Sequence, residues 1–169
     1  MTAMPKVEAA EKLNDSQLLR PRYLEALNLV ERLHRQLLDV IKDELDRRGE
    51  RVVNSVQALL LFNIGDQELT AGELRTRGHY LGSNVSYNLK KLVESGYIHH
   101  ERSDVDRRSV HVSLTEKGRE IREIVAKLFE RHLDSIEAVG NVTGQHFEEM
   151  NTSLRRLERF WLDQVRYRL

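Results

Sequence analysis

Apolar residues recur every three or four positions along much of this sequence, a spacing typical of amphipathic helices. The first such stretch runs from Tyr23 to Gly49 and predicts a helix about 36 to 39 Å long, longer than a domain of this size needs for its own core. A shorter apolar stretch predicts a second helix, which Asn54 or Ser55 caps and Gly65 ends. The N-terminal part of the chain is therefore predicted to be helical, and its first helix is long enough to connect two lobes of a protein.

The C-terminal part of the sequence predicts two further helices. Thr115 caps the first, Gly118 is tolerated near its start, and residues 140–144 break the pattern before Thr143 opens the last helix. The last helix has a nearly faultless apolar stripe: Phe147, Met150, Leu154, Leu157, Trp161 and Val165. Chain termini ordinarily fray, so an apolar stripe of this size at a chain end must pack against other apolar side chains. Packing within one subunit would provide such contacts, and so would a two-fold dimer interface built by the first and last helices.

Between these parts, the sequence predicts a short helix over residues 83–95 with two contrasting faces. Val85, Leu89, Leu92 and Val93 form an apolar stripe that can face a core. The opposite face carries side chains that hydrogen-bond or are positive: Ser83, Asn84, Ser86, Tyr87, Asn88, Lys90 and Lys91. No acid precedes Glu94, so this face suits a phosphate-rich groove.

The residues before this helix complete a helix-turn-helix. Thr70 and Glu73 have the spacing of a capping box, which predicts a short helix over residues 71–77. Gly78 ends that helix, and residues 79–82 form the turn into the helix at 83–95. The second helix is then the one that would read DNA.

The residues after this helix predict a β-hairpin. Gly96 suits a left-handed C-cap, and residues 97–102 form a candidate strand. Residues 109–114 alternate apolar and polar side chains, the pattern of a half-buried strand. A charged tip at residues 103–108 joins the two strands, so together they predict a hairpin wing.

The run GYIHHERSDVDRRSVHVSLTEKG closely resembles the winged-helix segment of MarR-type transcriptional regulators. The matching residues are Asp104, Asp106, Arg107 and Arg108 in the wing, and Leu114, Thr115 and Gly118 where the next helix starts. The order of the flanking helices also fits from about Tyr23 onward. One departure is that Tyr87 follows Ser86 where many members carry a basic residue, so we expect base contacts here that differ from the family's usual ones.

Together, pattern and resemblance predict a mainly α fold with a small β-hairpin wing. We expect a flexible N-terminal arm over residues 1–20, a helical dimerisation region over 21–48 and 119–169, and a winged helix-turn-helix DNA-binding domain over 52–118. The resemblance implies a homodimer that acts as a repressor on double-stranded DNA. It also implies a small aromatic or phenolic effector in a crevice with these candidate residues: His34, Leu37, Ile41, Leu59, Phe62 and Leu128. For any single one of these six residues, a place in the plain core is the favoured interpretation.

A two-fold dimer would place its reading helices in successive major grooves about 34 to 36 Å apart, on an inverted repeat. We expect Ser83, Lys90 and Lys91 to contact phosphates. Base readout would come from four residues: Asn84, Ser86, Tyr87 and Asn88. Asn can pair with adenine and a Tyr ring can pack on a thymine methyl, which favours A·T steps. At the wing, Arg107 or Arg108 would enter a minor groove, while Asp104 or Asp106 orients an arginine.

Composition narrows the function classes. The formal net charge is zero, so nucleic-acid binding must come from a local excess, and residues 75–108 hold seven Lys or Arg against four acids. The sequence has no cysteine, which excludes disulfides and thiol redox sensing. It has no apolar segment of membrane-spanning length and no apolar signal core, so we expect a cytoplasmic protein without a membrane partner.

The remaining alternatives are an enzyme, a metal protein and a protein-docking module. Nucleotide-binding, hydrolase-elbow and zinc-protease motifs are absent, and we expect neither catalytic residues nor a cofactor. His99 and His100 are adjacent on a predicted strand, where they point to opposite faces and cannot chelate one ion, so no metal is expected. A winged helix that binds protein instead of DNA is the alternative function.

Overall fold

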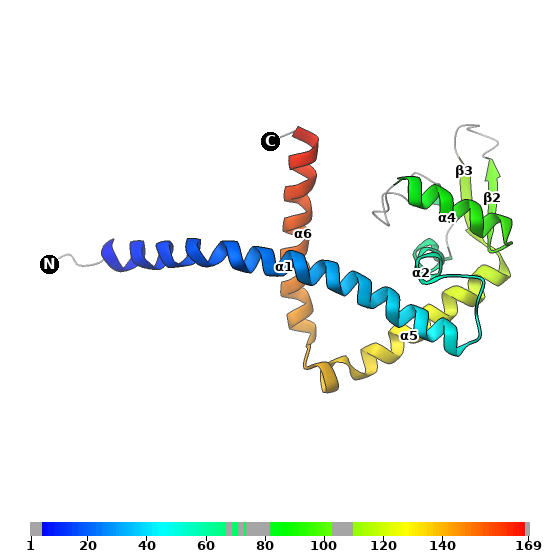
Figure 1. Cartoon of the computed structure of the whole chain (residues 1–169), viewed down its shortest axis with the longest axis horizontal. Helices are drawn as coiled ribbons and strands as arrows, with labels where there is room; N and C mark the ends of the chain where they lie inside the picture. Colours follow the sequence, from blue (N-terminus) through cyan, green and yellow to red (C-terminus); the bar gives the residue numbers. More distant parts are fainter. Residues whose placement is uncertain (1–4, 67–68, 71–72, 74–81, 103–109, 168–169) are drawn as a thin grey trace. The chain divides into compact units, whose positions relative to one another are not determined.

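The computed structural model describes residues 5–66, 69–70, 73, 82–102 and 110–167 (Figure 1). The chain forms two compact units, Met1–Val125 and Ala126–Leu169, and the division falls inside one helix, α5 (Glu116–Gly140). In the described residues, five helices and a three-stranded antiparallel sheet confirm the predicted mainly α fold with a small β wing.

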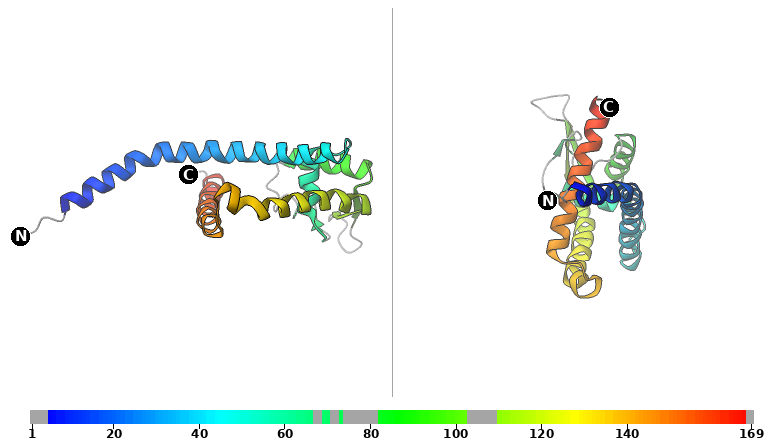
Figure 2. Two further views of the ribbon diagram at one scale, coloured as in Figure 1. Left: turned by 90° about the horizontal axis from the view of Figure 1, so that it is seen from below. Right: turned by 90° about the vertical axis from the view of Figure 1, so that its left-hand side faces the viewer.

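Helix α1 (Pro5–Arg47) runs unbroken through Pro21 (Figure 2). Residues 5–20, for which we expect a loosely ordered arm, are part of this helix in the structure. The run from Glu8 to Leu13 explains the difference, because its alanines, glutamates, lysine and leucine all have high helix propensity. The scarcity of large apolar side chains therefore does not prevent this stretch from forming a helix.

Helix α2 (Ser55–Ile64) packs against the C-terminal part of α1 and supplies much of the core of the first unit. Asn54 caps it as predicted, and the capping box is closed on both sides by Gln57: the Gln57 N–H donates to Asn54 Oδ1 at 2.9 Å, and the Asn54 N–H donates to Gln57 Oε1 at 3.1 Å. Ile41, Leu60 and Leu61 are buried between the two helices and their neighbours.

The sheet has the order β1-β3-β2. Strands β2 (Ile98–Arg102) and β3 (Val110–Leu114) form the predicted hairpin, with Ile98 opposite Leu114 and His100 opposite Val112. Val112 and Leu114 are buried while His111 and Ser113 are partly exposed, which confirms the alternation expected for β3. The sequence pattern missed β1 (Leu69–Thr70), because two residues are too short to show a period.

The Thr70–Glu73 capping box is also confirmed. The Glu73 N–H donates to Thr70 Oγ1 at 3.1 Å, and the Thr70 N–H donates to a Glu73 carboxylate oxygen at 2.7 Å. The helix predicted over residues 71–77 and the turn after it lie outside the described residues, apart from Glu73, which is helical.

The second unit consists of the C-terminal part of α5 and helix α6 (Gly144–Tyr167). Thr143 opens α6 as predicted: its Oγ1 accepts from the His146 N–H at 3.3 Å, and its N–H donates to His146 Nδ1 at 3.1 Å. In the described part of the chain, α6 contains no buried residue. Its apolar stripe is therefore not buried within the second unit.

Candidate nucleic-acid interface

Helix α4 (Gly82–Glu94) is the predicted reading helix. Buried side chains hold its inner face, and backbone hydrogen bonds hold its C-terminal end. Leu89 and Leu92 are buried, as the apolar stripe predicts. Gly96 adopts a φ of +76°, and the N–H groups of Gly96 and Tyr97 donate to the carbonyls of Val93 and Leu92. This is a Schellman cap, in which a glycine takes the left-handed conformation at no steric cost. It confirms the C-cap expected at Gly96.

The opposite face of α4 presents polar and basic side chains to solvent. Ser86 is exposed, the Tyr87 residue is 63% exposed, and the side chains of Lys90 and Lys91 are 76% and 50% exposed. Asn88 is half-buried at the edge of this face. Ser83 and Asn84 lie in the first turn of α4, but their side chains are outside the described part. We call the four residues Ser86, Tyr87, Lys90 and Lys91 the exposed face of α4.

One acid modifies the charge of this face. The Glu94 carboxylate lies 3.8 Å from Lys90 Nζ and 3.5 Å from Lys91 Nζ. Exposed pairs of this kind are worth about 0.2–1 kcal/mol and do not hold a lysine against a phosphate. They do reduce the local positive potential. The sequence signal for this pairing is the i+3 spacing from Lys91 and the i+4 spacing from Lys90 to Glu94.

The predicted wing residues Asp104, Asp106, Arg107 and Arg108 lie outside the described residues, so the expected contacts of the wing tip stay predictions. The strands that carry the tip are described, and His99 and His100 on β2 are both exposed. Within the described ranges, no three His, Cys, Asp or Glu side chains are grouped closely enough to hold a metal ion.

The six candidate effector residues differ widely in their surroundings. Ile41 is fully buried, Leu128 is almost so, and His34 is exposed. Leu37, Leu59 and Phe62 are half-buried, and Leu128 belongs to the second unit while the other five belong to the first. A cavity of about 230 Å³ near the end of α1 has none of the six in its lining, which runs from Lys42 to Ser55. The effector site therefore stays a prediction.

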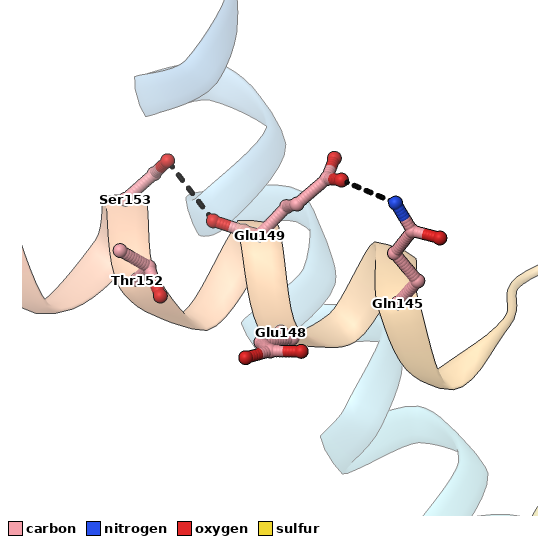
Figure 3. A pocket seen from close by; sticks show the side chains of 5 residues that line it. All are labelled: Gln145, Glu148, Glu149, Thr152 and Ser153. Carbon is pink, nitrogen blue, oxygen red and sulfur yellow. Dashed lines mark hydrogen bonds between the residues drawn. The ribbon is translucent and has the colours of Figure 1, made fainter.

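A hollow along α6 is lined by Gln145, Glu148, Glu149, Thr152 and Ser153 (Figure 3). Its polar groups bond to each other: Gln145 Nε2 donates to Glu149 Oε1 at 3.0 Å, and Ser153 Oγ donates to the Glu149 carbonyl at 3.0 Å. All five side chains come from one helix, so the hollow has only one wall and offers no enclosed site for a small molecule.

Comparison with known proteins identifies the family to which the chain belongs. A family model described as a winged helix DNA-binding domain matches residues 53–118. The chain is also 37% identical over 148 residues to the exopolysaccharide II synthesis transcriptional activator ExpG of Rhizobium meliloti, covering 86% of this chain and 74% of the relative. The chain belongs to the MarR family of winged-helix transcriptional regulators.

Several solved structures, MarR itself among them, have the same fold. A cysteine-to-serine variant of MarR from E. coli, complexed with operator DNA, has a TM-score of 0.64 and 20% identity, covering 80% of this chain and 95% of that one. FabT of Streptococcus pneumoniae, in complex with DNA, has a TM-score of 0.61 and 23% identity, covering 83% and 98%. The regulator BldR of Sulfolobus solfataricus has a TM-score of 0.65 and 18% identity, covering 80% and 96%.

Membership of the MarR family makes this chain a DNA-binding transcriptional regulator and not an enzyme. It confirms the family resemblance that the wing and the L-T-x-x-G run indicate. Among the helices the structure describes, none is long and apolar enough to cross a membrane.

Proposed function

We propose that this MarR-family regulator binds an inverted-repeat operator as a homodimer, with α4 of each protomer in a major groove. The observation that supports this most directly is the contrast across α4: Leu89 and Leu92 are buried on one side, while Tyr87, Lys90 and Lys91 are exposed on the other. Lys90, Lys91 and Ser83 contact phosphates and set the salt dependence. The neighbouring polar and aromatic side chains read bases.

Tyr87 is the base reader with the most distinctive chemistry. Its ring stands exposed in the middle of α4, where the resemblance leads us to expect a basic residue. A Tyr ring packs on the thymine methyl group and its hydroxyl hydrogen-bonds to base edges, whereas an Arg would favour guanine. We therefore propose a half-site with an A·T step opposite Tyr87, and Asn84 or Asn88 on a neighbouring adenine.

The dimer is supported by apolar surface that one copy leaves exposed. On α6, Met150 and Leu154 are each 41% exposed, Trp161 is 39% exposed and Val165 is 80% exposed. Covering a large apolar side chain fully is worth about 1.5–3 kcal/mol, so a second copy would gain considerable free energy by packing on this stripe. Together with α1, the stripe would form the dimerisation region.

Selection of duplexes from a random-sequence pool by the full-length protein tests operator binding. We expect the selected sequences to contain an inverted repeat whose half-sites are centred about one helical turn apart. Tyr87→Ala should lower affinity for the selected duplex much more than for a scrambled duplex. Lys91→Met should weaken both and reduce the slope of log K against log salt by about one. If the pool yields no preferred sequence, the protein-docking alternative replaces this proposal.

The sign of regulation and the effector are separate proposals. The resemblance favours a cytoplasmic repressor released by a small aromatic or phenolic ligand, whereas the name of the 37% identical relative, an activator, favours activation. A reporter gene distinguishes repression from activation. The selected duplex is placed over or upstream of its promoter, and expression is compared with and without the protein. A true effector must weaken DNA binding and be weakened by DNA to the same extent, because linkage is reciprocal.

A further inference from the structure

The first turn of α5 holds three consecutive backbone carbonyls at the end of the reading helix. Lys117 Nζ donates to the Ser95 carbonyl at 3.2 Å, Thr115 Oγ1 donates to the Gly96 carbonyl at 2.8 Å, and the Thr115 N–H donates to the Tyr97 carbonyl at 3.1 Å. Residues 95–97 join α4 to β2, so these bonds tie α5 directly to the C-terminal end of the reading helix. We call Thr115, Lys117 and the carbonyls of residues 95–97 the α4–α5 clamp.

The same turn of α5 also holds the end of the wing. Arg119 Nη1 donates to the Leu114 carbonyl at 3.0 Å, at the last residue of β3. Lys117 Nζ lies 4.1 Å from the centroid of the Tyr97 ring, which is almost fully buried. A cation over a buried aromatic face is a favourable contact with a defined geometry. The start of α5 thus contacts both the residues that follow α4 and the last residue of β3.

Thr115 is the centre of the clamp. Besides its bond to the Gly96 carbonyl, its Oγ1 accepts from the Gly118 N–H at 3.1 Å, which caps α5. One hydroxyl therefore starts α5 and fixes the end of α4. Because Thr115 Oγ1 makes both hydrogen bonds, it links the start of α5 directly to the residue that ends α4.

We propose that Thr115 and Lys117 are positioning residues for DNA recognition: they set the orientation of α4 relative to α5, and so determine the preference for specific over non-specific DNA without touching it. The inference rests on the proposed operator binding. Phosphate contacts tolerate small rotations of a helix, whereas base contacts in the major groove need correct geometry. Loosening the clamp therefore lowers specific affinity and leaves non-specific affinity unchanged.

The test compares full-length variants on the selected duplex and on a scrambled duplex of the same length, by fluorescence anisotropy at several salt concentrations. Lys117→Met removes the ammonium group and keeps the chain length, and Lys127→Met makes the same charge change farther along α5. Thr115→Val removes the hydroxyl at nearly constant shape, and Thr115→Ser restores it. We expect the specificity ratio to fall by about tenfold or more in Lys117→Met and Thr115→Val, the scale of losing one base contact. Lys127→Met and Thr115→Ser should keep the wild-type ratio.

Two results would overturn the inference. A uniform loss on both duplexes with a salt slope reduced by about one would mean that Lys117 binds phosphate. A lower melting temperature with an unchanged specificity ratio would mean that the clamp only stabilises the fold. Wild-type protein in the same titrations separates these results from failure of the proposed function, which would appear as no preference between the two duplexes.

Discussion

Gly118 gives the sharpest stability prediction, because two simple rules oppose each other there. Gly118 is helical and buried in α5, so helix propensity alone predicts that Gly118→Ala stabilises the protein by up to about 1 kcal/mol. A Cβ at this position would lie 2.1 Å from the Tyr97 carbonyl oxygen and 3.2 Å from its carbon. Those are backbone atoms that Thr115 already holds through its N–H.

The clash should decide the sign. Overpacking a well-filled site costs about 1–3 kcal/mol and sometimes more, and the Tyr97 backbone cannot rotate away as a flexible side chain could. A 2.1 Å approach to a backbone oxygen places the cost at the upper end of that range. After the propensity gain of up to about 1 kcal/mol is subtracted, we expect Gly118→Ala to lower the free energy of unfolding by about 2 kcal/mol. Gly118 is thus required here, and the expectation that it is merely tolerated near the start of the helix needs correction.

Urea unfolding followed by circular dichroism measures the effect, at one fixed protein concentration because a dimer's stability depends on it. Gly140→Ala is the matched control on the same helix, since its nearest contacts to a new Cβ are at 3.6 and 3.9 Å, which are ordinary distances. We expect this control to be neutral or slightly stabilised. If Gly118→Ala matches Gly140→Ala or exceeds wild type in stability, the reasoning about close approach is wrong.

Three further outcomes are expected. Glu94→Gln should raise affinity for scrambled DNA several-fold at low salt, because it frees Lys90 and Lys91 from a shared acid; equal anisotropy titrations would contradict this. Asn54→Ala should cost about 1 kcal/mol in urea unfolding by opening the capping box with Gln57, and Asn54→Ser should recover most of it. Trp161 is the only tryptophan, so its emission should shift to longer wavelength on dilution if the α6 stripe is a dimer interface; an emission that does not change down to monomer concentrations would argue against it.

Local signals in the sequence predicted those features that depend on neighbouring residues. The caps at Asn54, Thr70 and Gly96 depend on side chains within three residues or on a single backbone conformation, and all three are confirmed. The buried positions Leu89 and Leu92 followed from helical periodicity, which requires only a consistent apolar face.

Other features depend on parts of the chain that are distant in sequence. The role of Gly118 is set by the Tyr97 carbonyl, 21 residues earlier, and no periodicity reports such an approach. Strand β1 exists because Leu69 and Thr70 meet Val112 and His111 on β3, not because of its own pattern. The bond from Lys117 to the Ser95 carbonyl is likewise a tertiary contact. Of these positions, the motif resemblance indicated Gly118 alone, and only the fold gives the physical reason for it.

The charge arrangement on α4 has a consequence for how this regulator finds its site. Because the net charge is zero and Glu94 lies beside the two exposed lysines, we expect the protein to be attracted only weakly to phosphates in general. Weak phosphate attraction lowers the affinity for specific and for non-specific DNA alike, so the ratio between the two affinities depends on the base contacts. If the proposed operator binding holds, the residues proposed to read bases must supply a larger share of the binding free energy, and their geometry becomes more critical. The exposed Tyr87 and the hydrogen bonds of the α4–α5 clamp are consistent with that requirement.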